Sequence, residues 1–284
     1  MWRSLLFVPV LEDRFVAKAA TRGADAIVLD LEASVAPEMK DAARRALPDA
    51  ARRLAPHVPV TVRINPLWLP ALKDLEACVM PEVTSIHIAQ CESAEHVRAI
   101  AGIVAELEAE RSLPTGAITL VAMLESADAM TRVKEIASAS PRLVGMTLGV
   151  EDHATSMGVT TSSDLLRPAV YQLNQAAHAA GIASYAVPAS MASFGDLSAL
   201  ETEARYARSI GSAGGYAVHP AQVEILKTVF SPTPDELTWA KDVIEAAEHA
   251  RQGGKAVFKV AGQMIDQPLI TRARRILETS VPNT

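Results

Sequence analysis

Residues 143–180 read LVGMTLGVEDHATSMGVTTSSDLLRPAVYQLNQAAHAA, and this stretch holds the pattern that decides the fold. An apolar run from Leu143 to Glu151 is followed by a stretch from Leu165 to Ala180 in which apolar residues recur at three-and-four spacing. That order is typical of a βα unit, in which a strand of a parallel sheet precedes a helix that covers the sheet.

Outward from this stretch in both directions, the same unit recurs along the chain. The expected strands are Leu5 to Val10, Ala26 to Glu32, Val60 to Asn65, Ser85 to Gln90, Ile118 to Leu124, Leu143 to Glu151, Ile182 to Pro188 and Gly215 to Pro220. Strands this apolar must be buried on both faces, as the strands of a parallel barrel are. Gly23, Gly181 and Gly211 stand where the intervening helices are expected to end. We therefore predict an α/β fold of the (β/α)₈ (TIM) barrel type.

The main alternative is an open, doubly wound α/β sheet. The sequence disfavours it, because no GxGxxG follows the first strand and because eight units exceed the usual five or six of that fold.

The chain length of 284 residues fits one barrel and a short tail. After Phe230 the rhythm breaks at SPTPDE, and two helical segments are expected, at 234–252 and 267–279. We predict a barrel catalytic domain over residues 1–230 and a C-terminal helical extension over residues 231–284 that contributes to a subunit interface.

Composition excludes several classes of function. No apolar run reaches the roughly 18–20 residues that cross a bilayer, so no membrane span is expected. The net charge is −6 and the basic residues are dispersed, which argues against a nucleic-acid surface. Cys78 and Cys91 form no CxxC motif and have no clustered histidines, so neither a zinc site nor a disulfide framework is indicated. We predict a cytoplasmic protein.

The polar residues of the expected strands fall at the carboxyl ends, which form the catalytic face of barrel enzymes. They are Asp30, Glu32, Arg63, Asn65, Glu125, Glu151, Asp152 and His219. Glu125 and Asp152 follow neighbouring strands and suit Mg²⁺, which takes one or two protein carboxylates. Arg63 beside them would bind a substrate carboxylate through two hydrogen bonds. Alternatively, these three residues form a structural ion-pair network.

Other polar residues at this face keep two interpretations each. His219 is either a general base or ligand contact, or a hydrogen-bonded structural residue. Asp30 and Glu32 either orient the waters of a metal ion or bind backbone amides at a helix start.

A set of motifs appears in one order from Arg3 to Pro268. They are RSLLFVP, GADAIVLDLE with Lys40 and Arg44 after it, VRINP, MLES, GVED, AVHPAQVE and GQMIDQP. Together they resemble the citrate lyase beta-subunit-like family of CoA-ester lyases, within the HpcH/HpaI aldolase/citrate lyase superfamily. The resemblance implies a TIM barrel with a C-terminal helical extension, assembled as a homotrimer or hexamer.

The resemblance also implies an activity. Such enzymes cleave or form a carbon–carbon bond in a short 3-hydroxyacyl-CoA thioester, such as malyl-, citramalyl- or citryl-CoA, with acetyl-CoA and a 2-oxo acid as products. Glu125 and Asp152 would hold Mg²⁺, and Arg63 would bind the carboxylate of the oxo acid. Asp266 matches an aspartate that relatives deliver into a neighbouring subunit's site as acid/base, although it could also be a helix N-cap before Gln267. Positions that line the CoA or substrate pocket in relatives are matched by Arg3, Lys18, Val218 and His219.

Three positions depart from the family pattern. Ala33 stands where an acidic residue is common, and Ala89-Gln90 stands where many members have Pro-Lys. Residues 184–190 read SYAVPAS in place of an end that often contains Asp. The expected metal pair is unaffected, so we predict that the substrate pocket differs from that of the best-known malyl-CoA or citryl lyases.

Three other functions remain open from the sequence. One is a class II aldolase that acts on free hydroxy-oxo acids, and another is a thioesterase that uses the same metal site. The third is a non-catalytic accessory subunit.

Overall fold

The computed structural model describes residues 2–192, 195–252 and 257–280. The chain divides into two compact units, one from Trp2 to Phe230 and one from Ser231 onward. The division falls where the βα rhythm of the sequence breaks. The catalytic and interface roles assigned to the two parts stay predictions.

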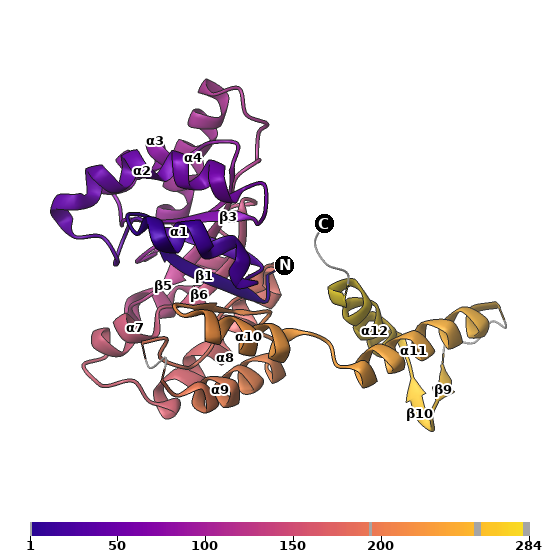
Figure 1. Ribbon diagram of the computed structural model, residues 1–284. Helices are drawn as coiled ribbons and strands as arrows, with labels where there is room; N and C mark the ends of the chain where they lie inside the picture. Colours follow the sequence, from indigo (N-terminus) through magenta and orange to yellow (C-terminus); the bar gives the residue numbers. More distant parts are fainter. Residues whose placement is uncertain (1, 193–194, 253–256, 281–284) are drawn as a thin grey trace. The chain divides into compact units, whose positions relative to one another are not determined.

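The first unit is built on one parallel sheet, with β7-β6-β5-β4-β3-β2-β1-β8 as the order of hydrogen-bonded neighbours. From β1 to β7 each strand therefore pairs with the next one in the sequence, and β1 also pairs with β8, which curls the sheet into a barrel with helices around it (Figure 1). The predicted (β/α)₈ class is confirmed. The strands are β1 (Ser4–Pro9), β2 (Ala26–Asp30), β3 (Val60–Ile64), β4 (Val83–Ile88), β5 (Thr119–Leu124), β6 (Leu143–Leu148), β7 (Ala183–Ser184) and β8 (Gly215–Ala217).

The helices of this unit lie between the strands in sequence. They are α1 (Asp13–Ala19), α2 (Lys40–Leu54), α3 (Leu69–Cys78), α4 (Ala94–Glu110), α5 (Ala127–Thr131), α6 (Val133–Ala137), α7 (Val150–Ser156), α8 (Ser163–Ala180), α9 (Leu197–Ser209) and α10 (Pro220–Phe230), with 3₁₀ turns η1 (Ala20–Arg22) and η2 (Pro37–Met39). Side chains at the N-caps of four of them accept a backbone N–H, which satisfies an otherwise unpaired donor: Ser93, Ser126, Ser162 and Asp196.

Three helical segments end as predicted. Gly23, Gly181 and Gly211 follow them with φ of 76°, 72° and 102°, in the left-handed region where a glycine has no Cβ penalty.

The largest differences from the expected strand bounds concern three strands. Two are much shorter in the structure than predicted, and the third ends three residues earlier than predicted. The strands predicted over 182–188 and 215–220 are reduced to β7 and β8, which do not pair with each other. A backbone hydrogen bond from the Ala213 N–H to the Ser184 carbonyl (2.7 Å) links the segment before β8 to β7. Pro188 has no N–H for a ladder, and the N–H groups of Val218 and His219 are taken by the Gln222 side chain.

The strand predicted over 143–151 ends at Leu148, because α7 begins at Val150. Glu151 and Asp152 therefore lie in the first turn of α7. An acidic first turn is favoured at a helix N-terminus.

The barrel interior is filled by side chains from the strands. Leu5, Val28, Val121, Tyr185 and Tyr216 form one buried cluster, while the intervening Leu6 and Ile27 belong to the larger cluster under the helices. The interior is thus a packed core, and chemistry is confined to the rim.

The second unit has a small core of its own. Helices α11 (Pro234–Gln252) and α12 (Gln267–Ser280) pack together around Ala240, Val243, Ile265, Ile270 and Ala273. A hairpin of β9 (Phe258–Val260) and β10 (Gln263–Ile265) joins them (Figure 1). The hairpin was not predicted, since each strand has three residues and the turn at Ala261-Gly262 lacks the usual Asn-Gly or Asp-Gly signal.

Throughout the described ranges, no helix has the length and apolar character needed to span a membrane.

Candidate active site

The carboxyl ends of β2 and β3 are joined by a buried ion pair. Arg63, in β3, donates from Nε and Nη2 to the two carboxylate oxygens of Asp30, each at 2.7 Å. The Asp30 side chain is 2% exposed and also accepts the N–H groups of Glu32 and Ser34. Burial alone would raise the pKa of Asp30, but the hydrogen bonds and charge of Arg63 outweigh it and hold the pKa below its ordinary value. Asp30 is thus both partner to Arg63 and acceptor for the loop after β2.

Glu32 lies on the other side of the same guanidinium. Its carboxylate is 3.3 Å from Arg63 Nη1, and the Arg63 guanidinium carbon lies 4.5 Å from the centroid of the Phe7 ring. Burial raises the pKa of Glu32 although the Arg63 charge opposes this, and the Asp30 charge adds to the rise. All three guanidinium nitrogens of Arg63 thus face carboxylates, and the edge between Nη1 and Nη2 is the one that a further carboxylate could approach.

Glu125 follows β5 directly and is 6% exposed. Burial raises its pKa to about 8, helped by the charges of Asp152 and Glu32, while Arg63 and a hydrogen bond from the Gln90 backbone act in the other direction. Glu125 thus lies near enough to Asp152, Glu32 and Arg63 for their charges to change its pKa. Gln90 donates from a left-handed backbone conformation, with φ of 47°.

Gly149 was missed by sequence reasoning. A Cβ at this position would lie 2.5 Å from Glu125 Cγ, so only a glycine leaves room for the Glu125 side chain. Its N–H also donates to the Leu124 carbonyl at 2.8 Å, which ties the end of β6 to the end of β5. No sequence signal marks it, because its φ of −80° is open to any residue.

The charge around Glu125 fits a divalent cation. Glu125 follows β5 directly, and Asp152 lies in the first turn of α7, after the neighbouring β6. The charge of Asp152 is part of what raises the Glu125 pKa. Within the described part of the chain, no group of three or more His, Cys, Asp or Glu side chains could hold a metal. Mg²⁺ needs no such cage, since it binds through one or two carboxylates with water and substrate oxygens completing the octahedron.

Two predicted pocket residues are not brought to this group. Arg3 lies at the amino end of β1 and donates from Nε and Nη2 to Asp25, which precedes β2, so it stands at the opposite end of the strands from Glu125. Lys18 is exposed on α1. Their roles in binding CoA stay predictions.

Val218 and His219 do lie at a carboxyl end, after β8. Their backbone N–H groups donate to the buried side chain of Gln222 at 2.8 and 3.1 Å. Val218 is 44% exposed. Gln222, which sequence reasoning overlooked, reaches back from the first turn of α10 as the glutamine of a capping box does, and that spacing was visible in AVHPAQ.

Asp266 belongs to the second unit. It lies between β10 and α12, and its carbonyl accepts the Ile270 N–H at 3.1 Å, which places it at the N-cap position of α12.

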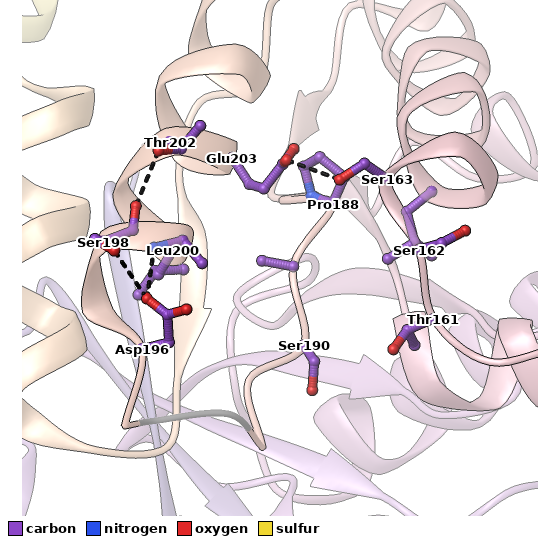
Figure 2. Close-up of a pocket in the computed structure, with 13 residues that line it drawn as sticks. Thr161, Ser162, Ser163, Pro188, Ser190, Asp196, Ser198, Leu200, Thr202 and Glu203 are labelled. Carbon is purple, nitrogen blue, oxygen red and sulfur yellow. Dashed lines mark hydrogen bonds between the residues drawn. The ribbon is translucent and has the colours of Figure 1, made fainter.

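A separate cavity of about 430 Å³ lies between the starts of α8 and α9 and the segment after β7. Figure 2 shows Ser163 directed at Glu203, and Asp196 accepting from Ser198 at the start of α9. The lining mixes hydroxyl-bearing and apolar residues with Asp196 and Glu203 and contains neither Glu125 nor Asp152, so the cavity is distinct from the carboxylate site.

Comparison with known proteins gives the family. The HpcH/HpaI aldolase/citrate lyase family model matches residues 3–220. The citrate lyase subunit beta of Leuconostoc mesenteroides subsp. cremoris is 32% identical over 99% of this chain and 94% of its own length. The (3S)-malyl-CoA thioesterase of Cereibacter sphaeroides is 34% identical over 97% of this chain and 93% of its own.

Among solved structures, the CitE protein of Mycobacterium tuberculosis in complex with magnesium, acetoacetate and coenzyme A matches with a TM-score of 0.75. It is 29% identical, and the match covers 98% of this chain and 97% of that one. The chain described here therefore belongs to the HpcH/HpaI aldolase/citrate lyase family, as its motifs predict.

Proposed function

We propose that the protein is a Mg²⁺-dependent carbon–carbon lyase of a short 3-hydroxyacyl-CoA, or the corresponding synthase. One observation carries the proposal: Glu125, directly after β5, and Asp152, in the first turn of α7 after the neighbouring β6, stand at the same end of the sheet as Arg63, whose terminal edge can receive a carboxylate. The family adds support, because its named relatives include a citrate lyase subunit and a CoA thioesterase.

Arg63 is proposed to bind the carboxylate of the 2-oxo acid. Asp30 fixes the guanidinium from Nε and Nη2, so the substrate approaches Nη1 and Nη2 and competes with Glu32 for Nη1. A guanidinium presents the matching pair of donors to a carboxylate, which orients the carbonyl carbon of the oxo acid as well as holding it.

In the cleavage direction, the 3-hydroxyl group releases its proton to solvent and the bond between the hydroxyl-bearing carbon and the CoA-side carbon breaks. The hydroxyl-bearing carbon becomes the carbonyl carbon of the oxo acid, and the electron pair of the broken bond passes to the CoA-side carbon as an acetyl-CoA enolate, whose protonation balances the proton lost by the hydroxyl. Magnesium, if held by Glu125 and Asp152, would polarise the oxygen that becomes this carbonyl oxygen. Asp266 is our proposal for the acid that protonates the enolate carbon, and in condensation for the base that removes the proton.

Asp266 is further proposed to serve a neighbouring copy's site in a homotrimer or hexamer. The C-terminal unit has its own core and presents Asp266 at a helix start that its hairpin holds.

The substrate class follows from charge at the rim. Ala33 and Gln90 are exposed and neutral, in the loops that follow β2 and β4. Gln90 lacks the positive charge that a lysine would offer an anionic substrate, so we favour malyl- or citramalyl-CoA, which carry fewer anionic groups than citryl-CoA.

Product analysis tests the proposal. The protein is incubated with Mg²⁺ and malyl-, citramalyl- or citryl-CoA in turn, and acetyl-CoA and the oxo acid are quantified together. We expect equal amounts of acetyl-CoA and of glyoxylate, pyruvate or oxaloacetate from at least one ester. The absence of any oxo acid with all three esters would contradict a lyase.

A thioesterase is the second candidate, favoured by the relative from Cereibacter sphaeroides. Hydrolysis of the CoA ester releases free thiol and the hydroxy acid without an oxo acid, so the same product analysis separates it from a lyase.

A class II aldolase that acts on free acids would not need CoA. Protection against thermal unfolding discriminates it, because a ligand stabilises the folded state only if it binds that state. The lyase proposal expects acetyl-CoA to raise the unfolding temperature in the presence of Mg²⁺.

A further inference from the structure

A hydrogen-bonded chain behind the site leads to Arg63. Leu31 lies between Asp30 and Glu32, whose carboxylates hold the guanidinium of Arg63. The Leu31 carbonyl accepts from two side chains, Lys40 Nζ at 2.8 Å and Asn65 Nδ2 at 2.9 Å. The Leu31 N–H donates in turn to the Arg63 carbonyl at 3.0 Å. The backbone of Arg63 therefore fixes the peptide group before Leu31. Lys40 and Asn65, which touch no part of the proposed substrate, fix the peptide group after it.

Asn65 is itself held by a fully buried carboxylate. Asp74, in α3, is 0% exposed, and its Oδ2 accepts both the backbone N–H and Nδ2 of Asn65, each at 2.7 Å. Its Oδ1 accepts Arg44 Nε at 2.7 Å. A carboxylate only accepts hydrogen bonds, so the Asn65 amide must present its NH₂ to Asp74, and the same NH₂ then meets the Leu31 carbonyl.

Burial of the Asp74 carboxylate costs more free energy than a purely structural contact would justify. A buried carboxylate is a weak stabiliser even when it is paired, because its removal from water offsets most of the attraction. Here the donors that satisfy Asp74 include the residue two positions after Arg63, on the strand end that points Arg63 at the rim. The chain from Asp74 through Asn65 to Leu31 thus connects a helix outside the barrel to the two carboxylates that orient the arginine.

We infer that Asn65 is a positioning residue for Arg63. Acting through the Leu31 carbonyl, it sets the spacing of Asp30 and Glu32 and so the direction in which the guanidinium faces. The consequence for binding rests on the proposed function, in which Arg63 receives the carboxylate of an oxo acid. Mg²⁺ held by Glu125 and Asp152 makes no contact with Arg63, so its binding depends on this chain less than binding of the oxo acid does.

The test compares Asn65→Ala with a matched control. Asn65→Ala removes Nδ2 and leaves the backbone N–H and Arg44 to satisfy Asp74. Asn174 is also buried and donates from Nδ2 to the Ile210 carbonyl and to Ser212, in a network of α8 away from Arg63, so Asn174→Ala loses equivalent bonds. Lys40→Met removes the second donor to Leu31, together with the Lys40 hydrogen bond to the Glu32 carbonyl, and leaves every hydrogen bond of Asp74 in place. It serves if Asn65→Ala does not fold.

Two measurements are made on the intact chain. The first follows the Arg63 Nε–H signal by NMR in protein with ¹⁵N-labelled arginine, with Arg63→Lys identifying the signal, and it needs no ligand. The second measures binding of Mg²⁺ alone, and of oxaloacetate in the presence of Mg²⁺, by calorimetry.

We expect Asn65→Ala to shift the Arg63 signal and speed its exchange with water, whereas Asn174→Ala leaves it unchanged. We expect the oxaloacetate Kd to rise about tenfold, the order that loss of one hydrogen bond to a positioned group produces, with the Mg²⁺ Kd changed by less than about twofold.

An Arg63 signal that is unmoved in Asn65→Ala, or in Lys40→Met if that variant is needed, overturns the inference whatever the ligand. A moved signal with an unchanged oxaloacetate Kd overturns the link to binding. If the parent protein fails to bind oxaloacetate while the signal still moves in the variant, the positioning role stands and the proposed ligand is wrong.

Discussion

Arg63 and Asp30 join the ends of β3 and β2 through two parallel hydrogen bonds of 2.7 Å, and the Asp30 side chain beneath them is 2% exposed. This pair fixes one edge of the guanidinium and leaves the other toward the rim. A lysine at position 63 would keep the charge but lose the planar pair of donors.

Arg63→Lys is therefore expected to lower kcat/KM for the CoA ester about 100-fold, because the oxo acid loses its two-point contact. Steady-state kinetics of the product-forming ester measures this. The control is Arg142→Lys, since Arg142 makes the same two-point contact with the buried Glu108. If Arg142→Lys reduces activity as much, the effect of Arg63→Lys reflects general destabilisation, and its assigned role is wrong.

Gly149→Ala is expected to abolish Mg²⁺ binding while the protein stays folded. The new Cβ would displace Glu125, whereas the backbone of Gly149 accepts an alanine. Calorimetry with Mg²⁺ and circular dichroism measure the two effects. Gly102→Ala is the control, because Gly102 is in α4 with nothing within 4 Å of a Cβ, and it should raise stability by about 0.5–1 kcal/mol. Unchanged Mg²⁺ affinity in Gly149→Ala would show that Glu125 is not a ligand.

His87 gives the free energy of unfolding a pH dependence. It is fully buried in β4 with Nδ1 2.8 Å from the Tyr216 hydroxyl, and burial, with the charge of Arg63, lowers its pKa from 6.5 to about 3. The unfolded state therefore binds the proton first as the pH falls. The contribution of neutral His87 is fully present above about pH 6.5 and is lost below it, by about 1.4 kcal/mol per pH unit down to about pH 3.

His87→Gln removes this titration, so its free energy of unfolding should fall less steeply than that of the parent between pH 6.5 and 4.5. Urea unfolding at a series of pH values measures both slopes. The exposed His57 provides His57→Gln as the control, which should follow the parent. Parallel curves for the parent and His87→Gln would contradict the assignment.

Sharing of Asp266 between copies can be tested by complementation. Glu125→Ala and Asp266→Asn are each expected to be inactive. Co-expressed with different affinity tags and purified through both, they should recover activity, because some sites then combine an intact Glu125 with an intact Asp266 from another copy. Mixed oligomers without activity would mean that each copy uses its own Asp266.

The fold was predictable because it depends on periodicity. Apolar runs such as Ala26–Asp30 followed by helical spacing identify βα units, and the placement of Arg63 and Glu125 at strand ends follows directly. The short β7 was predictable in part, since Pro188 has no N–H for a ladder, whereas the partners of its backbone, Met146 and Ala213, lie far from it in the sequence.

The position of the Glu125 carboxylate was predicted from the same periodicity, but the residues that pack around the site were not. Gly149 is required by a side chain on another strand, and Asp74 is an ordinary helix residue until the fold buries it against Asn65. Such requirements arise from tertiary contact and leave no local pattern.

Glu125 and Asp152 are proposed to hold the magnesium used in carbon–carbon cleavage. The decisive measurement is the Mg²⁺ dependence of oxo acid release from malyl- or citramalyl-CoA, in the parent and in Glu125→Gln and Asp152→Asn. We expect the parent to need Mg²⁺, chelation to stop release and fresh Mg²⁺ to restore it, and both variants to lose at least about 100-fold in rate at any practical Mg²⁺ concentration. Release of oxo acid at the parent's rate by either variant, or by the parent after chelation, would contradict this assignment.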